Sequence, residues 1–276
     1  MAIRIWHQSY TDLTKLPGYR FMLAEHARAI CGPDTVVDLH GLHPGTYPDG
    51  MPPIDMVAHR YPLRLADIQV IDNVVTAQRE GYDAVAISCF LDPGLEEART
   101  MVDIPVLSSC ETALLVASTV ARSFGLVTLN EAMAAYLRKL VDEYGFRERV
   151  KVIAATDPPM NEHDLDAAFA GSPAFVERFS REASVLLRSG VEIIVPAEGV
   201  LNIALVRNQV RAVGAAPVLD SYGSLLAFAE MMVQLRRKSG LKTSRLGAYA
   251  APPPGLVPNL RGILAAVMSQ ASPAVR

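Results

Sequence analysis

The sequence predicts an α/β protein with two pseudo-symmetric domains, each built on a parallel sheet, and an active site in the cleft between them. Apolar segments of strand length alternate with helical segments along the chain, which is typical of parallel sheets covered by helices. Two stretches repeat one plan of strand, polar turn, helix and Pro-Val-Leu-x-Ser, which indicates an internal duplication. The 276 residues, 50% of them hydrophobic and 20% charged, suit one large domain or two of ordinary size, and the duplication favours two.

The first repeated stretch, Tyr82–Arg99, places a cysteine between a strand and a helix. Ala84–Ile87 is a short, branched apolar run, as expected for a buried parallel strand. Asp92 is the expected N-cap of the following helix, and Pro93 suits its first position. Free N–H groups and the helix dipole would then lower the pKa of the Cys89 thiol, which predicts a catalytic cysteine. The alternative is a small buried hydrophobic residue, which is a common role of cysteine.

The second repeated stretch places a glutamate at the matching point. Val191–Val195 is predicted as another buried strand, and Val200–Val213 as the helix that follows it. Glu198 lies between them, just before Gly199, where the first half has Cys89. The alternative role for Glu198 is that of a structural acid. Both stretches then reach the shared segment, which is Pro105–Ser109 in the first half and Pro217–Ser221 in the second.

The remaining elements follow from the same alternation. Further strands are predicted at Ile3–Trp6, Thr35–Leu39, Ile104–Leu107, Phe124–Leu129 and Val152–Ala155. Helices are predicted near residues 19–31, 64–80, 112–122, 131–145, 172–189, 222–238 and 258–269. We expect residues 1–109 together with 220–276 to form the first domain, and residues 110–219 the second. Because ligands bind beyond the carboxyl ends of parallel strands, Cys89 and Glu198 should face each other across one cleft.

Polar and aromatic residues near the predicted strand ends are candidates for substrate binding. A polar loop is expected directly after the first strand, and Thr128 ends a strand of the second half, where ordinary turn chemistry is the alternative. The expected substrate-binding residues are Gln8, Ser9, Tyr47, Phe90, Thr128 and Gly199.

A segment from residue 40 to 62, rich in proline, glycine, histidine and tyrosine, is predicted as a long loop. Loops of this length often cover a binding site, which makes Tyr47 and His43 candidates for contact with the substrate. His40, His43 and His59 have the chemistry to bind a metal ion, but no regular element fixes their geometry and no cysteine lies near. We therefore expect no metal site.

The two remaining cysteines are expected to be less important. Cys31 falls at the end of a predicted helix and is expected to pack. Cys110 lies near a helix start and is an alternative reactive thiol, but it has no acidic counterpart in the repeat.

Composition limits the partners and the location that are expected. The formal net charge is -3 and no basic stripe is present, which argues against nucleic-acid binding. The sequence has no signal-peptide pattern and no long uncharged apolar run, so we expect no membrane association. Three cysteines without paired spacing argue against a disulfide framework and favour a cytoplasmic protein. The expected partner is a small-molecule substrate, and the apolar helices fit either a homo-oligomer or the core of one chain.

Three segments carry a family resemblance, and they are Ser88–Leu95 with Arg99, Pro105-Val106 with Glu111–Ala113, and Thr243-Ser244 with Gly247–Tyr249. The first looks like the leading cysteine motif of the hydantoin and allantoin racemase branch of the aspartate/glutamate/hydantoin racemase superfamily. The others look like the next segment and the carboxyl-terminal segment of that branch. The resemblance covers nearly the whole chain and implies two pseudo-symmetric α/β domains, no cofactor, and two cysteines flanking the substrate carbon. One cysteine removes a proton, and the other returns one on the opposite face.

The chain departs from this family pattern at two places. Where the family has a cysteine in a Leu-Gly-Cys-Ala-Gly-like turn, this chain has Pro196–Val200 with Glu198 at its centre. The family's Asn-Pro-Asn-Ser-like amino-terminal loop, which helps to hold the substrate, is replaced by Trp6–Ser9.

A cysteine facing a glutamate supports several reactions. At ordinary pKa values of about 8.5 for Cys and about 4.3 for Glu, the thiol is an acid on one face and the carboxylate a base on the other. The first hypothesis is a cofactor-independent racemase or isomerase of a small hydantoin-like or amino-acid-like carbonyl or carboxylate compound. The alternatives are a hydrolase of a cyclic amide or imide with Cys89 as nucleophile, a cis–trans isomerase acting through a thiol adduct, a decarboxylase, and a non-catalytic ligand-binding relative.

Overall fold

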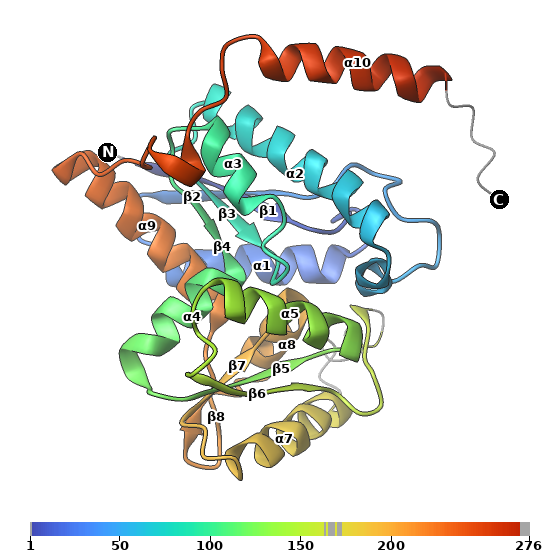
Figure 1. The fold of residues 1–276 in the computed structure, drawn as a ribbon. Helices are drawn as coiled ribbons and strands as arrows, with labels where there is room; N and C mark the ends of the chain where they lie inside the picture. Colours follow the sequence, from blue (N-terminus) through green and yellow to red (C-terminus); the bar gives the residue numbers. More distant parts are fainter. Residues whose placement is uncertain (1, 163, 165–168, 170–172, 271–276) are drawn as a thin grey trace.

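The computed structural model describes residues 2–162, 164, 169 and 173–270. The upper half in Figure 1 is built on a four-stranded parallel sheet in the order β2-β1-β3-β4. The strands are β1 (Ile3–Ser9), β2 (Thr35–His40), β3 (Ala84–Ser88) and β4 (Val106–Ser108). β3 is buried along its whole length in the middle of this sheet, which explains its continuous apolar run.

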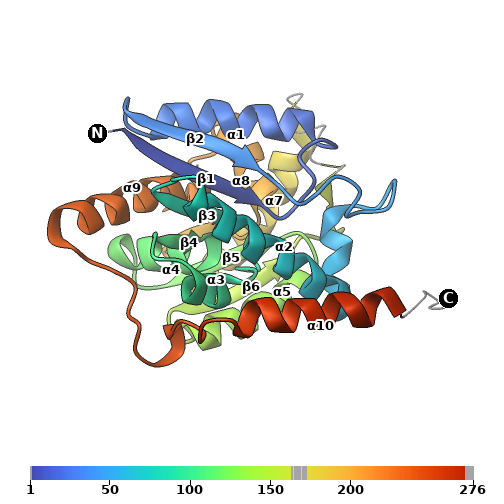
Figure 2. The same ribbon diagram turned by 90° about the horizontal axis from the view of Figure 1, so that it is seen from above.

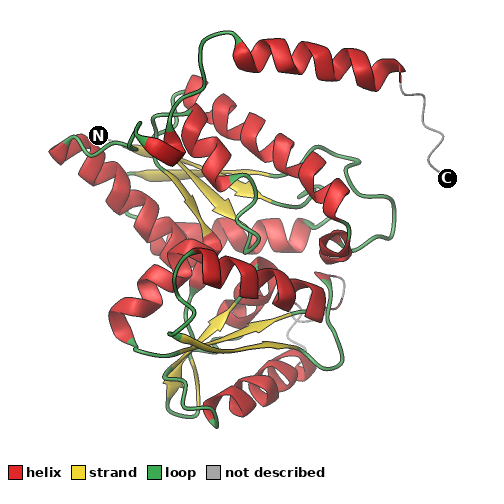
Figure 3. Cartoon of the chain, in the orientation of Figure 1, coloured by secondary structure: helices red, strands yellow, loops and turns green. Residues whose placement is uncertain are grey.

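Helices cover both faces of this first sheet, as Figures 1 and 3 show. α2 (Arg60–Arg79) and α3 (Leu95–Met101) lie on one face, and α1 (Pro17–Ile30) and α9 (Ser221–Ser239) lie on the other. α1 begins with a proline, whose missing N–H costs nothing in the first helical turn. Tyr19, Leu23 and Ala27 form a buried stripe at helical spacing, so α1 packs onto the sheet with one face and exposes the other.

The second half is built on a three-stranded parallel sheet in the order β6-β5-β7. Its strands are β5 (Phe124–Thr128), β6 (Val150–Ala155) and β7 (Ile193–Pro196). α5 (Glu131–Glu143) and α8 (Gly199–Arg207) lie on the side toward the first sheet, and α7 (Pro173–Leu187) covers the outer side (Figure 1). α8 is shorter than the predicted helix over 200–213, because Gln209 adopts a left-handed φ of 56° and a hairpin of β8 (Ala212–Val213) and β9 (Ala216–Pro217) follows.

The predicted duplication has a counterpart in the two sheets. The first Pro-Val-Leu segment contributes β4, which pairs in parallel with β3, and the second places Val218 in parallel beside Ile194 of β7. A helix follows each segment, α4 (Ser109–Val120) in the first half and α9 in the second, and the two helices pack against each other. The predicted fold class, α/β with parallel sheets in two similar halves, is therefore confirmed. The exact domain boundaries stay a prediction, with one sheet lying within residues 1–109 and the other within 110–219.

Two segments near the site differ from the prediction. The sequence predicts a polar loop from His7, but β1 continues to Ser9, because β2 and β3 pair with it along its length and bury these side chains. The segment from residue 40 to 62 is not a loop throughout, since it contains a 3-10 helix, η1 (Pro53–Ala58). Ile54 and Met56 of η1 are buried, so this segment packs against the rest of the protein.

The last helix, α10 (Leu256–Gln270), runs along the outside of the first half (Figure 2). Arg261 forms an ion pair there with Asp72 of α2. Among the described residues, no helix has both the length and the apolar character needed to span a bilayer.

Candidate active site

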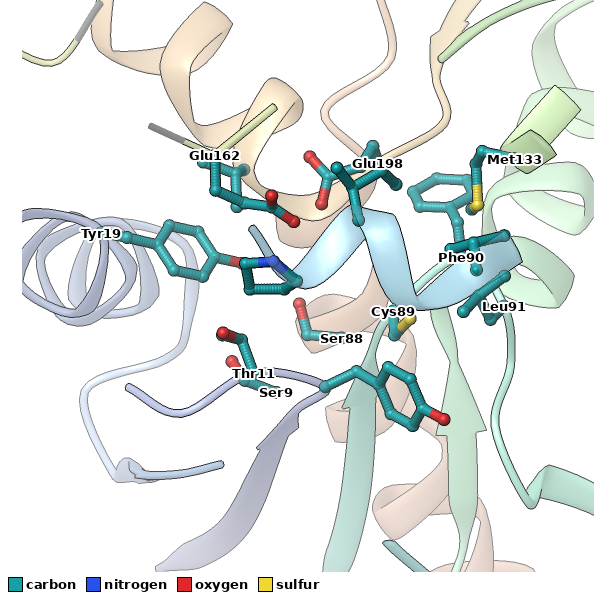
Figure 4. Close-up of a pocket in the computed structure, with 15 residues that line it drawn as sticks. Ser9, Thr11, Tyr19, Ser88, Cys89, Phe90, Leu91, Met133, Glu162 and Glu198 are labelled. Carbon is teal, nitrogen blue, oxygen red and sulfur yellow. The ribbon is translucent and has the colours of Figure 1, made fainter. Parts of the chain in front are cut away.

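A pocket lies between the two halves of the molecule, beyond the carboxyl ends of β1, β3 and β7 (Figure 4). Its empty volume, the opening to solvent included, is ≈ 500 Å³. Parallel α/β sheets bind their ligands at this position. The lining residues include Ser9, Tyr19, Cys89, Phe90, Glu162 and Glu198. The pocket therefore brings Cys89 and Glu198 into one cavity.

Cys89 directly follows β3 and is partly exposed to the pocket. The sequence predicts a helix N-terminus beside it, with Asp92 as N-cap and Pro93 in the first turn. This prediction is wrong, because Asp92 and Gly94 both adopt left-handed conformations and α3 begins only at Leu95. Among the described residues, no helix therefore begins directly after the thiol to stabilise a negative charge there.

The surroundings of Cys89 keep its thiol protonated. Burial raises the pKa of Cys89 well above its ordinary value, the Leu91 N–H opposes this effect, and the Glu198 carboxylate adds to it. The expected lowering of the thiol pKa is thus reversed. The raised pKa favours the protonated thiol over the thiolate at neutral pH.

Asp92 caps α4 and not the helix that follows it. Its carboxylate accepts hydrogen bonds from the backbone N–H groups of Cys110 at 2.8 Å and Glu111 at 2.9 Å. The hydroxyls of Ser108 at 2.6 Å and Tyr144 at 2.8 Å donate to the same carboxylate. Cys110, the alternative thiol, is fully buried at this capped terminus and lies outside the pocket lining. Asp92 thereby ties the turn after β3 to α4 and to the end of α5.

Glu198 occupies the matching turn of the second half, and a helix follows it directly. It is the N-cap of α8, and its Oε2 accepts the Leu201 N–H at 2.7 Å. Burial raises the pKa of Glu198 to about 7, and the N–H groups of Leu201, Val200 and Gly199 keep it from rising further. The usual N-caps are Ser, Thr, Asp and Asn, so capping alone does not explain a glutamate here. Near pH 7 this carboxyl can either take or give a proton.

A second acid, Glu162, faces the same pocket and is not among the residues predicted from the sequence. It is 4% exposed, and its Oε2 has no hydrogen-bond partner among the described residues. Burial, and then the Glu198 carboxylate, raise the pKa of Glu162 to about 8. Figure 4 shows the two carboxyl groups on one side of the pocket and Cys89 on the other. Its place in the chain shortly after β6 is the signal that could have found it, since binding residues gather at strand ends.

Tyr19 of α1 is also missing from the predicted residues, and it brings the first half against the Glu198 turn. Its hydroxyl interacts with the side chain of Ser88, and burial raises its pKa above the ordinary value. A Cβ added to Gly199 would lie 2.9 Å from Tyr19 Oη, so a glycine is needed for this approach. Gly199 thus packs against Tyr19 and does not line the pocket, where the sequence predicts a substrate contact.

Ser9 and Phe90, both predicted as substrate-binding residues, line the pocket. Gln8, predicted with them, does not line it. Successive side chains of a strand point to opposite faces, and Gln8 hydrogen-bonds to Trp6 at 3.0 Å and to Asn73 at 3.0 Å. Because β1 extends through these residues, the Ser9 side chain points into the pocket and the Gln8 side chain points away from it.

Thr128 and Tyr47, the other predicted contacts, support loops and do not line the pocket. Thr128 is fully buried, and its hydroxyl donates to the Ala197 carbonyl at 3.2 Å. Tyr47 is buried as well, and its hydroxyl donates to the Tyr10 carbonyl at 2.6 Å. The segment that contains Tyr47 reaches the pocket through Ile54 and its neighbours in η1.

The segments that carry the family resemblance also brace the site from outside. Arg99 donates two hydrogen bonds to the Glu111 carboxylate, at 3.0 and 2.5 Å, and two more to the Val106 carbonyl. It also donates to the Tyr249 hydroxyl at 3.3 Å. Such a bidentate pair is rigid, so it fixes α3 against β4 and α4 and holds the strand beside Cys89 in place.

The ionisable groups of the described lining of the pocket are acidic and none is basic. Among the described residues that line it, none is a lysine, arginine or histidine. Across the described part of the chain, no group of three His, Cys, Asp or Glu side chains is placed to hold a metal ion. What the pocket offers is two carboxyl groups, one thiol and several hydroxyls, a set of groups suited to moving protons.

Two parallel-sheet halves, with a thiol and carboxyl groups in the pocket at their junction, are the architecture of a two-domain α/β enzyme. The family model described as Asp/Glu/Hydantoin racemase matches residues 22–229. The chain belongs to this family, and the protein is an isomerase of the Asp/Glu/hydantoin racemase type.

Individual relatives agree with this assignment. The hydantoin racemase of Pseudomonas sp. (strain NS671) is 32% identical over 185 residues, which are 66% of this chain and 70% of that protein. The hydantoin racemase of Rhizobium meliloti is 28% identical over 185 residues, with 66% and 72% of the two chains covered. The solved allantoin racemase from Klebsiella pneumoniae has a TM-score of 0.74 at 25% identity and covers 91% of this chain and 94% of its own.

Proposed function

We propose that this protein racemises a small cyclic amide of the hydantoin type, with Glu198 and Cys89 as its acid/base pair. The observation behind this proposal is that the two side chains reach one pocket from matching turns of the two halves. Similar proteins named as racemases of hydantoins and of allantoin support a ring substrate of this class.

In this mechanism, ionised Glu198 is the base. It takes a proton from the ring carbon next to a carbonyl, and the electron pair moves toward the carbonyl oxygen. Cys89 then gives its thiol proton to the opposite face of that carbon, which inverts the stereocentre. The mirror-image substrate needs protonated Glu198 and the Cys89 thiolate, a less populated pair because the pKa of Cys89 is high. The enzyme therefore has a preferred direction of proton transfer, while the equilibrium between the enantiomers is unchanged.

The charge of the pocket favours an uncharged substrate. The carboxylate of a free amino acid would lie near Glu162 and Glu198, and the described lining residues include no cationic side chain to pair with it. Burying an unpaired charge is costly, whereas the amide groups of a neutral ring can be satisfied by hydroxyl and carboxyl groups. We therefore place hydantoin-like rings ahead of amino acids as substrates.

The hydrolase hypothesis requires a nucleophilic thiolate at Cys89. Because burial raises the pKa of Cys89, little thiolate is present at neutral pH. This argues against nucleophilic attack and in favour of Cys89 as a proton donor.

The test uses single enantiomers of 5-methylhydantoin and 5-benzylhydantoin in deuterated water, with chiral chromatography and mass spectrometry as readouts. A two-base mechanism predicts that early product carries deuterium while the recovered substrate remains protiated. Equal deuterium in both enantiomers from the start would overturn the Cys89/Glu198 pairing. Loss of optical purity no faster than in protein-free buffer would overturn the proposed substrate class, and a ring-opened product would revive the hydrolase hypothesis.

A further inference from the structure

Glu162 is a buried acid that has no role in the transfer of protons between Glu198 and Cys89. Its side chain lines the pocket and its Oε2 lacks a hydrogen-bond partner among the described residues. A buried polar atom without a partner is destabilising, and an unpaired one in a native protein calls for an explanation. A ligand atom bound in the pocket would supply the missing partner.

The groups around Glu162 favour its neutral form. Among the described residues, the titratable side chains that act on it are Glu198 and Asp55, which are acidic, and Tyr47. No cationic side chain is present among the described lining residues to hold it as an anion. Burial and Glu198 raise the pKa of Glu162 to about 8, so at pH 7 it is mostly a carboxylic acid. A carboxylic acid kept neutral in this way can donate an O–H hydrogen bond.

The free oxygen of Glu162 is the one placed to carry this proton. The backbone N–H groups of Ile54 and of Glu162 itself are directed at the carboxyl group. Oε2 is the oxygen left without a partner among the described residues, and Figure 4 shows the carboxyl group directed into the pocket on the same side as Glu198. A substrate carbonyl next to the carbon that Glu198 deprotonates would therefore lie on the Glu162 side.

We propose that Glu162 is a further catalytic residue, whose Oε2–H donates a hydrogen bond to the substrate carbonyl oxygen and stabilises the enolate formed there. This proposal rests on the proposed racemase function. When Glu198 takes the proton from the adjacent carbon, the C–H electron pair forms a C=C bond and the carbonyl π pair moves onto the oxygen. The negative charge develops beside Oε2–H, where the described lining residues supply no cation and a preorganised donor has its largest effect.

The second half of the reaction reverses these changes. Cys89 gives its S–H proton to the carbon, the C=C electron pair forms the new C–H bond, the oxygen electron pair re-forms the carbonyl, and the charge is left on the Cys89 sulfur. Exchange with solvent then returns a proton to Cys89 and removes the abstracted proton from Glu198. Glu162 keeps its own proton throughout. Its role is thus distinct from that of Glu198, although both are carboxyl groups in one pocket.

Two substitutions of Glu162 test whether its hydrogen-bond donation, and not its acidity or its size, is what the reaction needs. Glu162→Gln keeps a neutral donor, and Glu162→Leu removes the donor at similar volume. We expect kcat for 5-benzylhydantoin racemisation to fall about 10²–10³-fold in Glu162→Leu and less than about tenfold in Glu162→Gln, with smaller changes in KM. Unchanged kcat in Glu162→Leu, or equal losses in the two variants, would overturn the proposal.

Folding and local charge are controlled separately. Glu162→Leu removes the acceptor of the Ile54 and Glu162 N–H groups, so thermal unfolding checks that this variant folds, and Glu162→Gln keeps that acceptor. Asp55→Asn removes a neighbouring negative charge from an exposed position outside the pocket. Turnover of Asp55→Asn should stay within about twofold of the wild type, since no hydrogen bond to the substrate is lost.

A ligand that cannot react separates this proposal from the proposed function. 5,5-Dimethylhydantoin has the ring carbonyls but no proton on the ring carbon, and calorimetry measures its binding. About two- to tenfold weaker binding to Glu162→Leu than to the wild type would support the hydrogen bond, even if the wild type racemised no hydantoin. Absence of hydantoin racemisation by the wild type would overturn the proposed function but not the hydrogen bond from Glu162. Equal binding together with equal turnover would overturn the role of Glu162 and leave the proposed function standing.

Discussion

The Cys89 turn and the Glu198 turn end equivalent strands, but only the second leads directly into a helix. Glu198 is itself the N-cap of α8, whereas the chain after Cys89 makes two left-handed residues, Asp92 and Gly94, before α3 begins at Leu95. The helix terminus that favours an anion therefore lies at the carboxylate and is absent at the thiol. The two residues hold matching positions, burial raises the pKa of both, and the N–H groups of the α8 terminus limit that rise at Glu198.

This difference gives the two walls of the pocket opposite chemical characters. The pKa of Glu198 is about 7, so its carboxylate is available as a base near neutral pH. The pKa of Cys89 is raised well above its ordinary value, mainly by burial, so the thiol is available as an acid. In the proposed mechanism, two thiols in matching turns would treat both faces of a substrate alike, whereas a carboxylate and a thiol would not.

Removal of the thiol should have the largest effect on turnover. Cys89→Ala is expected to lower kcat by about 10²–10⁴-fold, because no group remains to protonate one face of the substrate. Solvent deuterium should still enter the recovered substrate, since Glu198 can remove and return a proton on its own face. Cys31→Ala is the matched control, because Cys31 lies at the end of α1 and does not line the pocket. Racemisation by Cys89→Ala within about threefold of the wild-type rate would contradict the acid role.

Removal of the base on the other wall should lower turnover by a similar or smaller factor. Glu198→Gln keeps an oxygen that can accept the Leu201 N–H, so the cap of α8 is retained while the base is lost. We expect kcat to fall about 10²–10³-fold, with the unfolding temperature nearly unchanged. A large loss of stability with normal turnover of the folded fraction would instead assign Glu198 a capping role.

The pH profile of kcat/KM sharpens this prediction. Because ionised Glu198 is the active form, kcat/KM should rise with pH up to about 7, and it should fall above about 8 as Glu162 loses its proton. Glu198→Cys restores a thiol in each turn and should move the acid limb to higher pH. An acid limb that stays near pH 7 in Glu198→Cys would show that another group is responsible.

The first turn depends on Asp92 for its shape, which gives a prediction about stability. Asp92→Ala removes the acceptor for two backbone N–H groups of α4 and for the hydroxyls of Ser108 and Tyr144. We expect the free energy of unfolding in urea to fall by about 2–4 kcal/mol. Tyr144→Phe removes one of these hydrogen bonds and should cost about 1 kcal/mol. A loss below about 1 kcal/mol in Asp92→Ala would mean that the cap contributes little to stability.

The two turns were predictable as a pair because both depend on local patterns. Buried apolar runs mark the strands before Cys89 and Glu198, and the repeated Pro-Val-Leu segment marks β4 beside β3 and the single bridge of Val218 beside β7. The helix start after Cys89 was not predictable, because Asp-Pro-Gly fits both an N-cap and a left-handed turn. The choice depends on Asp92 reaching the Cys110 N–H, a residue 18 positions away.

The rest of the site depends on tertiary packing. Gln8 and Ser9 are adjacent and both polar, and the face of β1 that meets the cleft decides that Ser9 lines the pocket. From the sequence, Tyr19 is expected only to pack, as one member of the buried face of a helix. Glu162 reads as one more acid in a polar segment until η1 and the Glu198 turn enclose it.

The smallest expected effect concerns the contact that joins the two turns. A Cβ at residue 199 would lie 2.9 Å from Tyr19 Oη and 3.5 Å from the Ser88 carbonyl oxygen. Gly199→Ala is therefore expected to cost about 1–3 kcal/mol of unfolding free energy, the range for an overpacked contact that relaxes in part. Tyr19→Phe removes the hydroxyl that the new methyl group would meet, so the double variant should recover much of this loss in urea unfolding. Purely additive losses would show that the two positions do not interact. Ser88 precedes Cys89 and Gly199 follows Glu198, so a shift at this contact would change the spacing of the proposed acid and base, and turnover of the double variant tests whether that spacing matters.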